Sequence, residues 1–191
     1  MNNRKIVVLL SGRGSNFVAI HKAIRRGDLK AEIGCVISNV PDAAGLALAR
    51  EFGLETLCLP SRGVDRSEYD RRLLAAVRLY DPGLVCLAGF MRILSEVFLV
   101  EYAGRVINIH PALLPSFPGL HAQRQALEYG VKITGCSVHF VDRGVDTGLI
   151  IMQRAVEVLE GDTEESLSAR ILNQEHDLYW RAIAFVLEKK D

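Results

Sequence analysis

The stretch that decides the fold is KIVVLL-SGRGSN, residues 5–16. Its first half is an almost unbroken apolar run, which is typical of a strand buried on both faces of a parallel sheet. Its second half, Ser11–Asn16, is called the glycine turn below, and turns of this composition end a strand and open a helix. Phe17, Ile20 and Ile24 then recur at helical spacing, so a strand, a turn and a helix are predicted in that order.

The same alternation continues over the first hundred residues. Further strands are predicted at Ile33–Ser38, Glu55–Leu59, Leu84–Leu87 and Arg105–Ile109. Helices are predicted between them at Ala43–Arg50, around Tyr69–Val77 and at Ser95–Tyr102. Apolar strands that alternate with helices indicate a Rossmann-like α/β fold, in which a mostly parallel sheet has helices on both faces.

The second half of the chain has a different pattern. A proline-rich loop (Pro111–Leu120) and a short helix (Arg124–Tyr129) precede two strands at Ile133–Val141 and Leu149–Val158. We expect these strands to extend the sheet, one of them antiparallel. A long closing helix then starts at Asp162–Glu165, whose D-x-x-E pattern predicts a capping box. Residues 1–100 and 101–191 are therefore expected to share one sheet within a single domain.

Composition excludes several functional classes. The 191 residues are 49% hydrophobic, and 23 Lys and Arg balance 23 Asp and Glu. Without a basic field, binding to nucleic acid or to an anionic membrane surface is not expected. No apolar run approaches the roughly 18 residues that span a bilayer. The four cysteines are far apart, which indicates neither a metal site nor a disulfide framework and favours the cytoplasm.

The glycine turn is a candidate phosphate site. Small residues before a helix let backbone N–H groups face an anion, and Ser15 and Asn16 would add side-chain donors beside Gly14. A dinucleotide fingerprint would need glycine where Phe17 stands, and a P-loop would need Gly-Lys-Ser/Thr. A single phosphate monoester suits the turn better. The alternative is an ordinary tight turn with Ser15 as the helix N-cap.

A second candidate cluster lies at the end of the predicted fifth strand. Asn108 and His110 alternate with Ile109, so both side chains point to the same side, where an amide and an imidazole could stabilise an oxyanion and move a proton. Asp146 stands in a glycine-flanked loop and would favour the imidazolium form if the fold brings it to His110. Alternatively, Asn108 and His110 are structural, Asp146 makes only an Asx-turn, and His139 is a packed core histidine.

Several blocks resemble one known family. NIHPALLPSFPG (108–119) resembles the signature of the folate-dependent formyltransferases, and PGLH (118–121) resembles their glycinamide ribonucleotide branch. The glycine turn, AGFMRIL (88–94), GCSVHFV (135–141) and QEH (174–176) follow in family order. The resemblance implies transfer of a formyl group from 10-formyltetrahydrofolate to the amine of glycinamide ribonucleotide, with no metal.

The resemblance also implies roles for individual residues. The catalytic residues would be Asn108, His110 and Asp146. The ribonucleotide would be bound by Gly14, Ser15, Asn16 and Glu175, although Glu175 could instead lie on a solvated helix face. The folate would be bound by Arg66, Met91, Arg92, Ile93, Leu94, Asn108, Val141, Asp142 and Asp146. Asp142 stands where the family can have Thr, which leaves the pterin contacts open.

Other functions remain possible at this stage. A formyltetrahydrofolate hydrolase, a methionyl-tRNA formyltransferase or a sugar-amine formyltransferase could use the same three catalytic residues. The length leaves no room for the extra modules of the first two, and the neutral charge disfavours tRNA. The alternative outside the enzymes is a non-catalytic nucleotide-binding module. The expected partners are small molecules, without nucleic acid or membrane, and the protein is expected to be a monomer or a homodimer.

Overall fold

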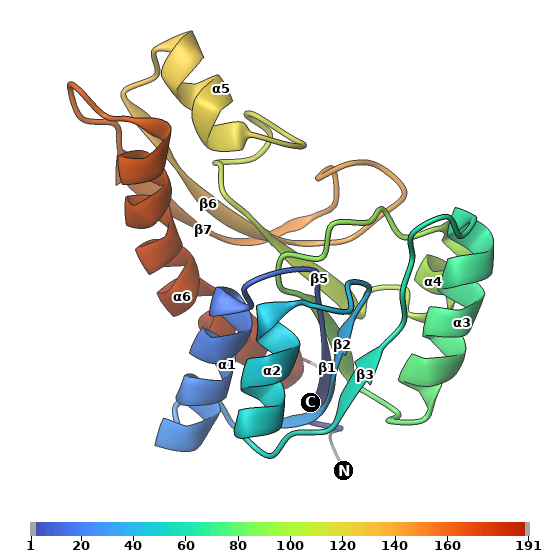
Figure 1. Cartoon of the computed structure of the whole chain (residues 1–191). Helices are drawn as coiled ribbons and strands as arrows, with labels where there is room; N and C mark the ends of the chain where they lie inside the picture. The colour runs from blue at the N-terminus through green and yellow to red at the C-terminus, as the bar shows by residue number, and fades with distance from the viewer. Residues whose placement is uncertain (1–2, 190–191) are drawn as a thin grey trace.

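The computed structural model describes residues 3–189, and their strands form one seven-stranded sheet in the order β3-β2-β1-β4-β5-β6-β7 (Figure 1). The strands are β1 (Lys5–Leu10), β2 (Glu32–Ser38), β3 (Thr56–Cys58), β4 (Leu84–Leu87), β5 (Val106–His110), β6 (Ile133–Phe140) and β7 (Ile150–Glu157). Neighbours from β3 to β5 pair parallel, whereas β6 is antiparallel to both β5 and β7. The predicted mostly parallel sheet with one antiparallel strand is confirmed.

Helices cover both faces of this sheet, as predicted. They are α1 (Ser15–Arg26), α2 (Ala44–Glu51), α3 (Arg66–Arg78), α4 (Glu96–Glu101), α5 (Ala122–Tyr129) and α6 (Glu164–Glu188). Side chains of α1, α2 and α6 belong to one buried cluster, and those of α3 and α4 belong to a second. In the part of the chain that is described, no helix combines the length and apolarity needed to cross a membrane.

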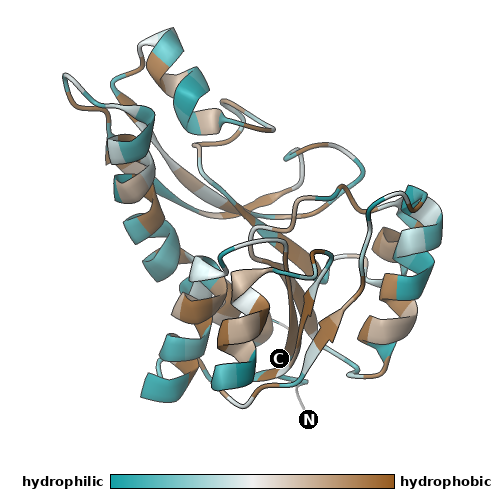
Figure 2. Cartoon of the chain, viewed as in Figure 1, coloured by the Kyte–Doolittle hydropathy of each residue, from teal (hydrophilic) through white to brown (hydrophobic). Residues whose placement is uncertain are grey.

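Strand β1 lies between the two clusters. Its residues Ile6, Val8 and Leu10 pack in the first cluster, and Val7 and Leu9 pack in the second. Successive side chains of a strand point to opposite faces, so a strand with helices on both sides must be apolar at every position. Figure 2 shows the hydrophobic strands inside and hydrophilic helix surfaces outside.

The start of α6 differs from the predicted capping box by one residue. The N-cap is Thr163, whose hydroxyl accepts a hydrogen bond from the Ser166 N–H while the Ser166 hydroxyl accepts one from the Thr163 N–H. Asp162 is not the cap because Arg170 holds its carboxylate, with Nη1–Oδ2 and Nη2–Oδ1 distances of 2.8 and 2.7 Å. The predicted cap at Asp162 was wrong because the capping pattern does not include the ion pair with Arg170.

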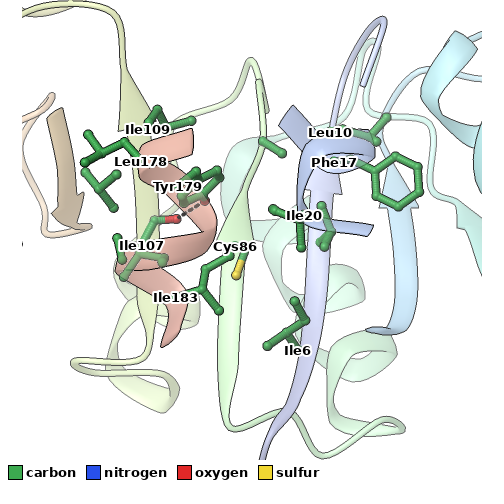
Figure 3. Close-up of a cluster of buried hydrophobic side chains, with 14 of the residues drawn as sticks. Ile6, Leu10, Phe17, Ile20, Cys86, Ile107, Ile109, Leu178, Tyr179 and Ile183 are labelled. Carbon is green, nitrogen blue, oxygen red and sulfur yellow. Dashed lines mark hydrogen bonds between the residues drawn. The ribbon is translucent and has the colours of Figure 1, made fainter. Parts of the chain in front are cut away.

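Tyr179 on α6 joins the closing helix to the sheet (Figure 3). Its fully buried hydroxyl donates a hydrogen bond shared between the carbonyl oxygens of Leu87 on β4, at 2.8 Å, and Ile107 on β5, at 3.2 Å. Its ring packs in the first cluster. The closing helix is therefore held by one polar anchor within an apolar interface. One of the two strands that it contacts, β5, carries the predicted catalytic residues Asn108 and His110.

Replacing this anchor tests its contribution. We expect Tyr179→Phe to lower the free energy of unfolding by about 1–3 kcal/mol, because it removes a buried hydroxyl donor without emptying the core. Urea denaturation would measure the change. The matched control is Tyr129→Phe, at an exposed tyrosine of α5, which should leave the stability unchanged. Equal effects of the two substitutions would contradict the anchoring role.

Candidate active site

The structure brings Asn108, His110 and Asp146 together at one edge of the sheet. Ile107 and Ile109 pack in the first buried cluster, so Asn108 and His110 face the other side of β5. Asp146 comes from the loop between β6 and β7. Its Oδ2 lies 3.2 Å from Nδ1 of His110, and its Oδ1 lies 3.5 Å from Nδ2 of Asn108.

Both ring nitrogens of His110 face hydrogen-bond acceptors. Nδ1 faces the Asp146 carboxylate, and Nε2 lies 2.8 Å from the carbonyl oxygen of Phe117. The ring is therefore held between a carboxylate and a backbone carbonyl. The ring is also buried. The fold therefore fixes the orientation of the imidazole from both sides.

The carboxylate of Asp146 is held as an anion. Burial raises its pKa, but this effect is outweighed by hydrogen bonds from His139 and from the Gly119 N–H and by the charges of His110 and His139. The net result is a pKa below the ordinary value of 3.8. The Gly119 nitrogen lies 2.8 Å from Oδ2. Asp146 is thus ionised throughout the neutral range and faces an imidazole.

His139 also belongs to this cluster, although its sequence pattern indicates only a packed core histidine. The side chain is buried, with 2% exposed, as expected for a packed histidine. Its Nε2, however, lies 3.3 Å from Nδ2 of Asn108 and 3.5 Å from Oδ1 of Asp146. The register of β5 against β6 places His139 directly opposite Asn108. Predicting the antiparallel pairing of these two strands, with its register, would have revealed the contact.

A cavity of about 770 Å³ opens beside the cluster. One side is formed by the segment Met91–Leu94, called the pocket wall below, and the other by the loop that carries Val141, Asp142 and Asp146. Asn108, His110 and His139 line it as well. Large apolar cavities with a few convergent polar groups are typical ligand sites. The cluster therefore faces a space large enough for an organic molecule.

The predicted folate-binding residues do not all reach this cavity. Arg66 is the first residue of α3, lies exposed, and is not among the residues that line the cavity. Arg92 does line it, with its guanidinium 4.5 Å from the centre of the Tyr69 ring. The carboxylate of Asp142 accepts hydrogen bonds from Gly144 N and Thr147 Oγ1 at 3.0 and 2.7 Å, so it stabilises its own loop.

The glycine turn leads into α1 without a side-chain cap. Gly14 is the N-cap, with φ of 76°, and a Cβ atom there would lie 2.7 Å from Cα of Gly45. Ser15 is the first helical residue, so the alternative in which it caps the helix is wrong. Helix N-termini leave backbone N–H groups without intrahelical partners. These groups, at the start of a twelve-residue helix, can face an anion.

Asn16 and Glu175 form a buried pair beside this turn. Asn16 Nδ2 donates to Glu175 Oε2 at 2.8 Å, which joins α1 to α6. Glu175 is only 7% exposed, so the alternative of a solvated helix face is wrong. Burial raises its pKa, and the hydrogen bond from Asn16 offsets this only in part. Two of the predicted ribonucleotide-binding residues thus contact each other across the helix interface.

The chain matches the formyl transferase family model over residues 4–183. The chain belongs to the formyl transferase family. This formyl transferase is 49% identical over 175 residues to phosphoribosylglycinamide formyltransferase of Escherichia coli, covering 91% of this chain and 82% of the relative. It is 44% identical to the human trifunctional purine biosynthetic protein adenosine-3, covering 95% of this chain but only 18% of that protein.

The fold agrees with that of a solved relative. The crystal structure of glycinamide ribonucleotide transformylase 1 from Symbiobacterium toebii superposes with a TM-score of 0.95 at 47% identity. The match covers 98% of this formyl transferase and 89% of that chain. The family resemblance and the prediction of a formyltransferase enzyme are confirmed. In residues 3–189, no group of three or more His, Cys, Asp or Glu residues is placed to hold a metal ion.

The buried Glu175 gives a pH-dependent prediction. A carboxyl group whose pKa is raised on folding stabilises the folded state at low pH. This stabilisation is lost as the pH rises from 4.5, the pKa of the group in the unfolded chain, through its raised pKa in the folded chain. Glu175→Gln keeps an oxygen acceptor for Asn16 and has no charge to bury. We expect it to raise the melting temperature at pH 8 by a few degrees, since a kcal/mol corresponds to about 2–4 °C at this size.

The pH dependence distinguishes this cause from a general packing effect. The increase in melting temperature caused by Glu175→Gln should shrink towards zero as the pH falls to about 4, where the glutamate and the glutamine are both neutral. Differential scanning calorimetry from pH 4 to 8 would measure it. Glu128→Gln, at an exposed residue of α5, is the control and should show no such trend. A constant difference at every pH would refute the burial argument.

Proposed function

We propose that this formyl transferase moves the formyl group of 10-formyltetrahydrofolate to the amine of glycinamide ribonucleotide, a step of de novo purine biosynthesis. The observation that carries the proposal is the gathering of Asn108, His110 and Asp146 on a cavity bounded by the pocket wall. The names of the relatives support the choice of substrate. The E. coli and S. toebii proteins are named for this ribonucleotide, and each is more than 45% identical to the chain.

The proposed reaction is an acyl transfer. The amine nitrogen of the ribonucleotide attacks the formyl carbon, and the carbonyl oxygen becomes an oxyanion. Asn108 and the imidazolium of His110 would stabilise this oxyanion by donating hydrogen bonds. When the bond from the formyl carbon to the folate N10 breaks, N10 receives the proton that the amine loses. Asp146 would hold His110 in its charged form and assist this proton transfer, and no step requires a metal.

Binding roles follow from the same proposal. The phosphate of the ribonucleotide would meet backbone N–H groups at Gly14, Ser15 and Asn16, and Glu175 would face its amine from α6. The folate ring system would lie between the pocket wall and the loop of Val141, Asp142 and Asp146. Arg66 would reach the glutamate tail outside the cavity, at its mouth. In this division, residues 1–100 would form the phosphate-binding half and residues 101–191 the catalytic and folate-binding half, with the pocket wall and Arg66 added from the first half.

The remaining expectations belong to this proposal as well. The partners would be the two small substrates, with no nucleic acid or membrane, and the protein would act as a monomer or a homodimer. All four cysteines are free thiols, which agrees with a reducing cytoplasm.

The direct test is a reaction of the protein with glycinamide ribonucleotide and 10-formyltetrahydrofolate. We expect release of tetrahydrofolate, which absorbance would monitor. Mass spectrometry should detect a ribonucleotide that is 28 mass units heavier, the gain expected from a formyl group. Release of tetrahydrofolate without any amine would favour a hydrolase. Product with only an amino sugar nucleotide would favour a sugar-amine formyltransferase. Binding without turnover would favour a nucleotide-binding module and refute the proposal.

The oxyanion role of Asn108 gives a quantitative prediction. We expect Asn108→Ala to lower kcat by about 10²–10³, the usual cost of one oxyanion donor. Asn173→Ala, at an exposed position of α6 away from the cavity, is the matched control and should retain wild-type turnover. Steady-state kinetics of both variants would test the oxyanion role of Asn108. Near-normal turnover of Asn108→Ala would remove this residue from the mechanism.

A further inference from the structure

A closed ring of hydrogen bonds joins the loops that follow the first four strands. The backbone N–H of Met91 donates to Oγ of Ser11 at 2.7 Å, and Ser11 Oγ donates to Oδ1 of Asn39 at 2.5 Å. Asn39 Nδ2 then donates to Oγ of Ser61 at 3.0 Å. Nη1 of Arg92 lies 3.3 Å from the Ser61 carbonyl oxygen, and the Met91–Arg92 peptide bond closes the ring.

Ser11 occupies a special position in this ring, because it belongs to the glycine turn and also contacts the pocket wall. Its backbone N–H donates to the carbonyl of Gly89 at 3.0 Å, two residues before the wall begins. Its side chain bonds to the first nitrogen of the wall. Ser11 therefore joins the turn to the wall by one hydrogen bond and to the chain just before the wall by another.

The surroundings of the ring limit how far the turn and the wall can move. Asn39 and Ser61 are buried, so water has little access to compete for their hydrogen bonds. On its other side the turn rests against α2, where Gly45 N donates to the Gly12 carbonyl at 3.0 Å. The close approach of Gly14 to Gly45 leaves no room there for a side chain. The turn is thus braced between α2 and the wall.

We propose that Ser11 is a positioning residue that sets the separation between the phosphate subsite and the folate pocket. This inference rests on the proposed function, in which the turn binds the ribonucleotide phosphate and the wall binds the folate. Ser11 acts through the backbone of Met91 and touches no reacting atom. Transfer requires the amine to lie about 3–3.5 Å from the formyl carbon, and small misplacements are costly. A fixed separation of the two subsites meets that requirement.

A ligand that spans both subsites tests the separation itself. The probe is a covalent adduct that joins glycinamide ribonucleotide to a folate analogue with carbon in place of N10, which cannot react. Its affinity depends on the distance between the subsites, whereas the ribonucleotide alone and the folate analogue alone can each follow a displaced subsite. Calorimetry on the full chain gives dissociation constants for all three ligands.

For Ser11→Ala we expect a loss of affinity for the adduct relative to wild type. This loss should be about tenfold larger than the combined losses of affinity for the two single ligands. The turnover number should fall by a similar factor, with the KM values of the two substrates within about twofold of wild type. Asn39→Ala breaks the same ring from a residue outside the turn and should act in the same direction. Ser67→Ala, at a hydroxyl on α3 outside this ring, is the matched control and should bind the adduct normally.

The outcomes separate this inference from the proposed function. If the wild-type chain binds both single ligands and the adduct, and Ser11→Ala binds the adduct equally well, the positioning role is refuted while the proposed function stands. Losses for the adduct that merely equal the combined losses of the single ligands also refute it, because they indicate general disorder. Failure of the wild-type chain to bind either single ligand overturns the proposed function and this inference with it.

Discussion

Strand β6 runs antiparallel to β5 in a register that opposes Asn108 to His139 and His110 to Ser137. The rest of the site depends on this pairing. It sets two polar side chains of β5 against two of β6, and β6 ends beside the start of β5. The loop that follows can then place the Asp146 carboxylate within hydrogen-bonding reach of His110.

The cluster is also an electrostatic arrangement in which each group depends on the others. Asp146 is mostly buried, and a buried carboxylate is costly unless it is paired and hydrogen-bonded. Its partners are two imidazoles, the Asn108 amide and the Gly119 N–H. The same carboxylate orients His110 from one side, while the Phe117 carbonyl orients it from the other. A fixed arrangement of this kind requires little reorganisation when charge develops on a substrate.

Much of this molecule was predictable from local sequence pattern. Strand β1, the glycine turn and α1 follow from an apolar run, two glycines and helical spacing within the first 26 residues. The family resemblance predicts Met91–Leu94 as a binding segment, and this segment does line the cavity. The cap of α6 was misplaced by one residue, since Arg170 competes for Asp162. Arg66 lies outside the cavity because it begins α3 on an exposed turn.

By itself, the sequence determined which segments become strands and helices, because hydrophobic period and turn chemistry are local properties of neighbouring residues. It also determined which residue types are available for chemistry. Only the tertiary structure decided which of them meet. His139 contacts Asn108 from 31 residues away, and Asn16 contacts Glu175 from 159 residues away. Strand register and helix packing set such contacts, and both depend on how separate buried surfaces fit together, which no local pattern records.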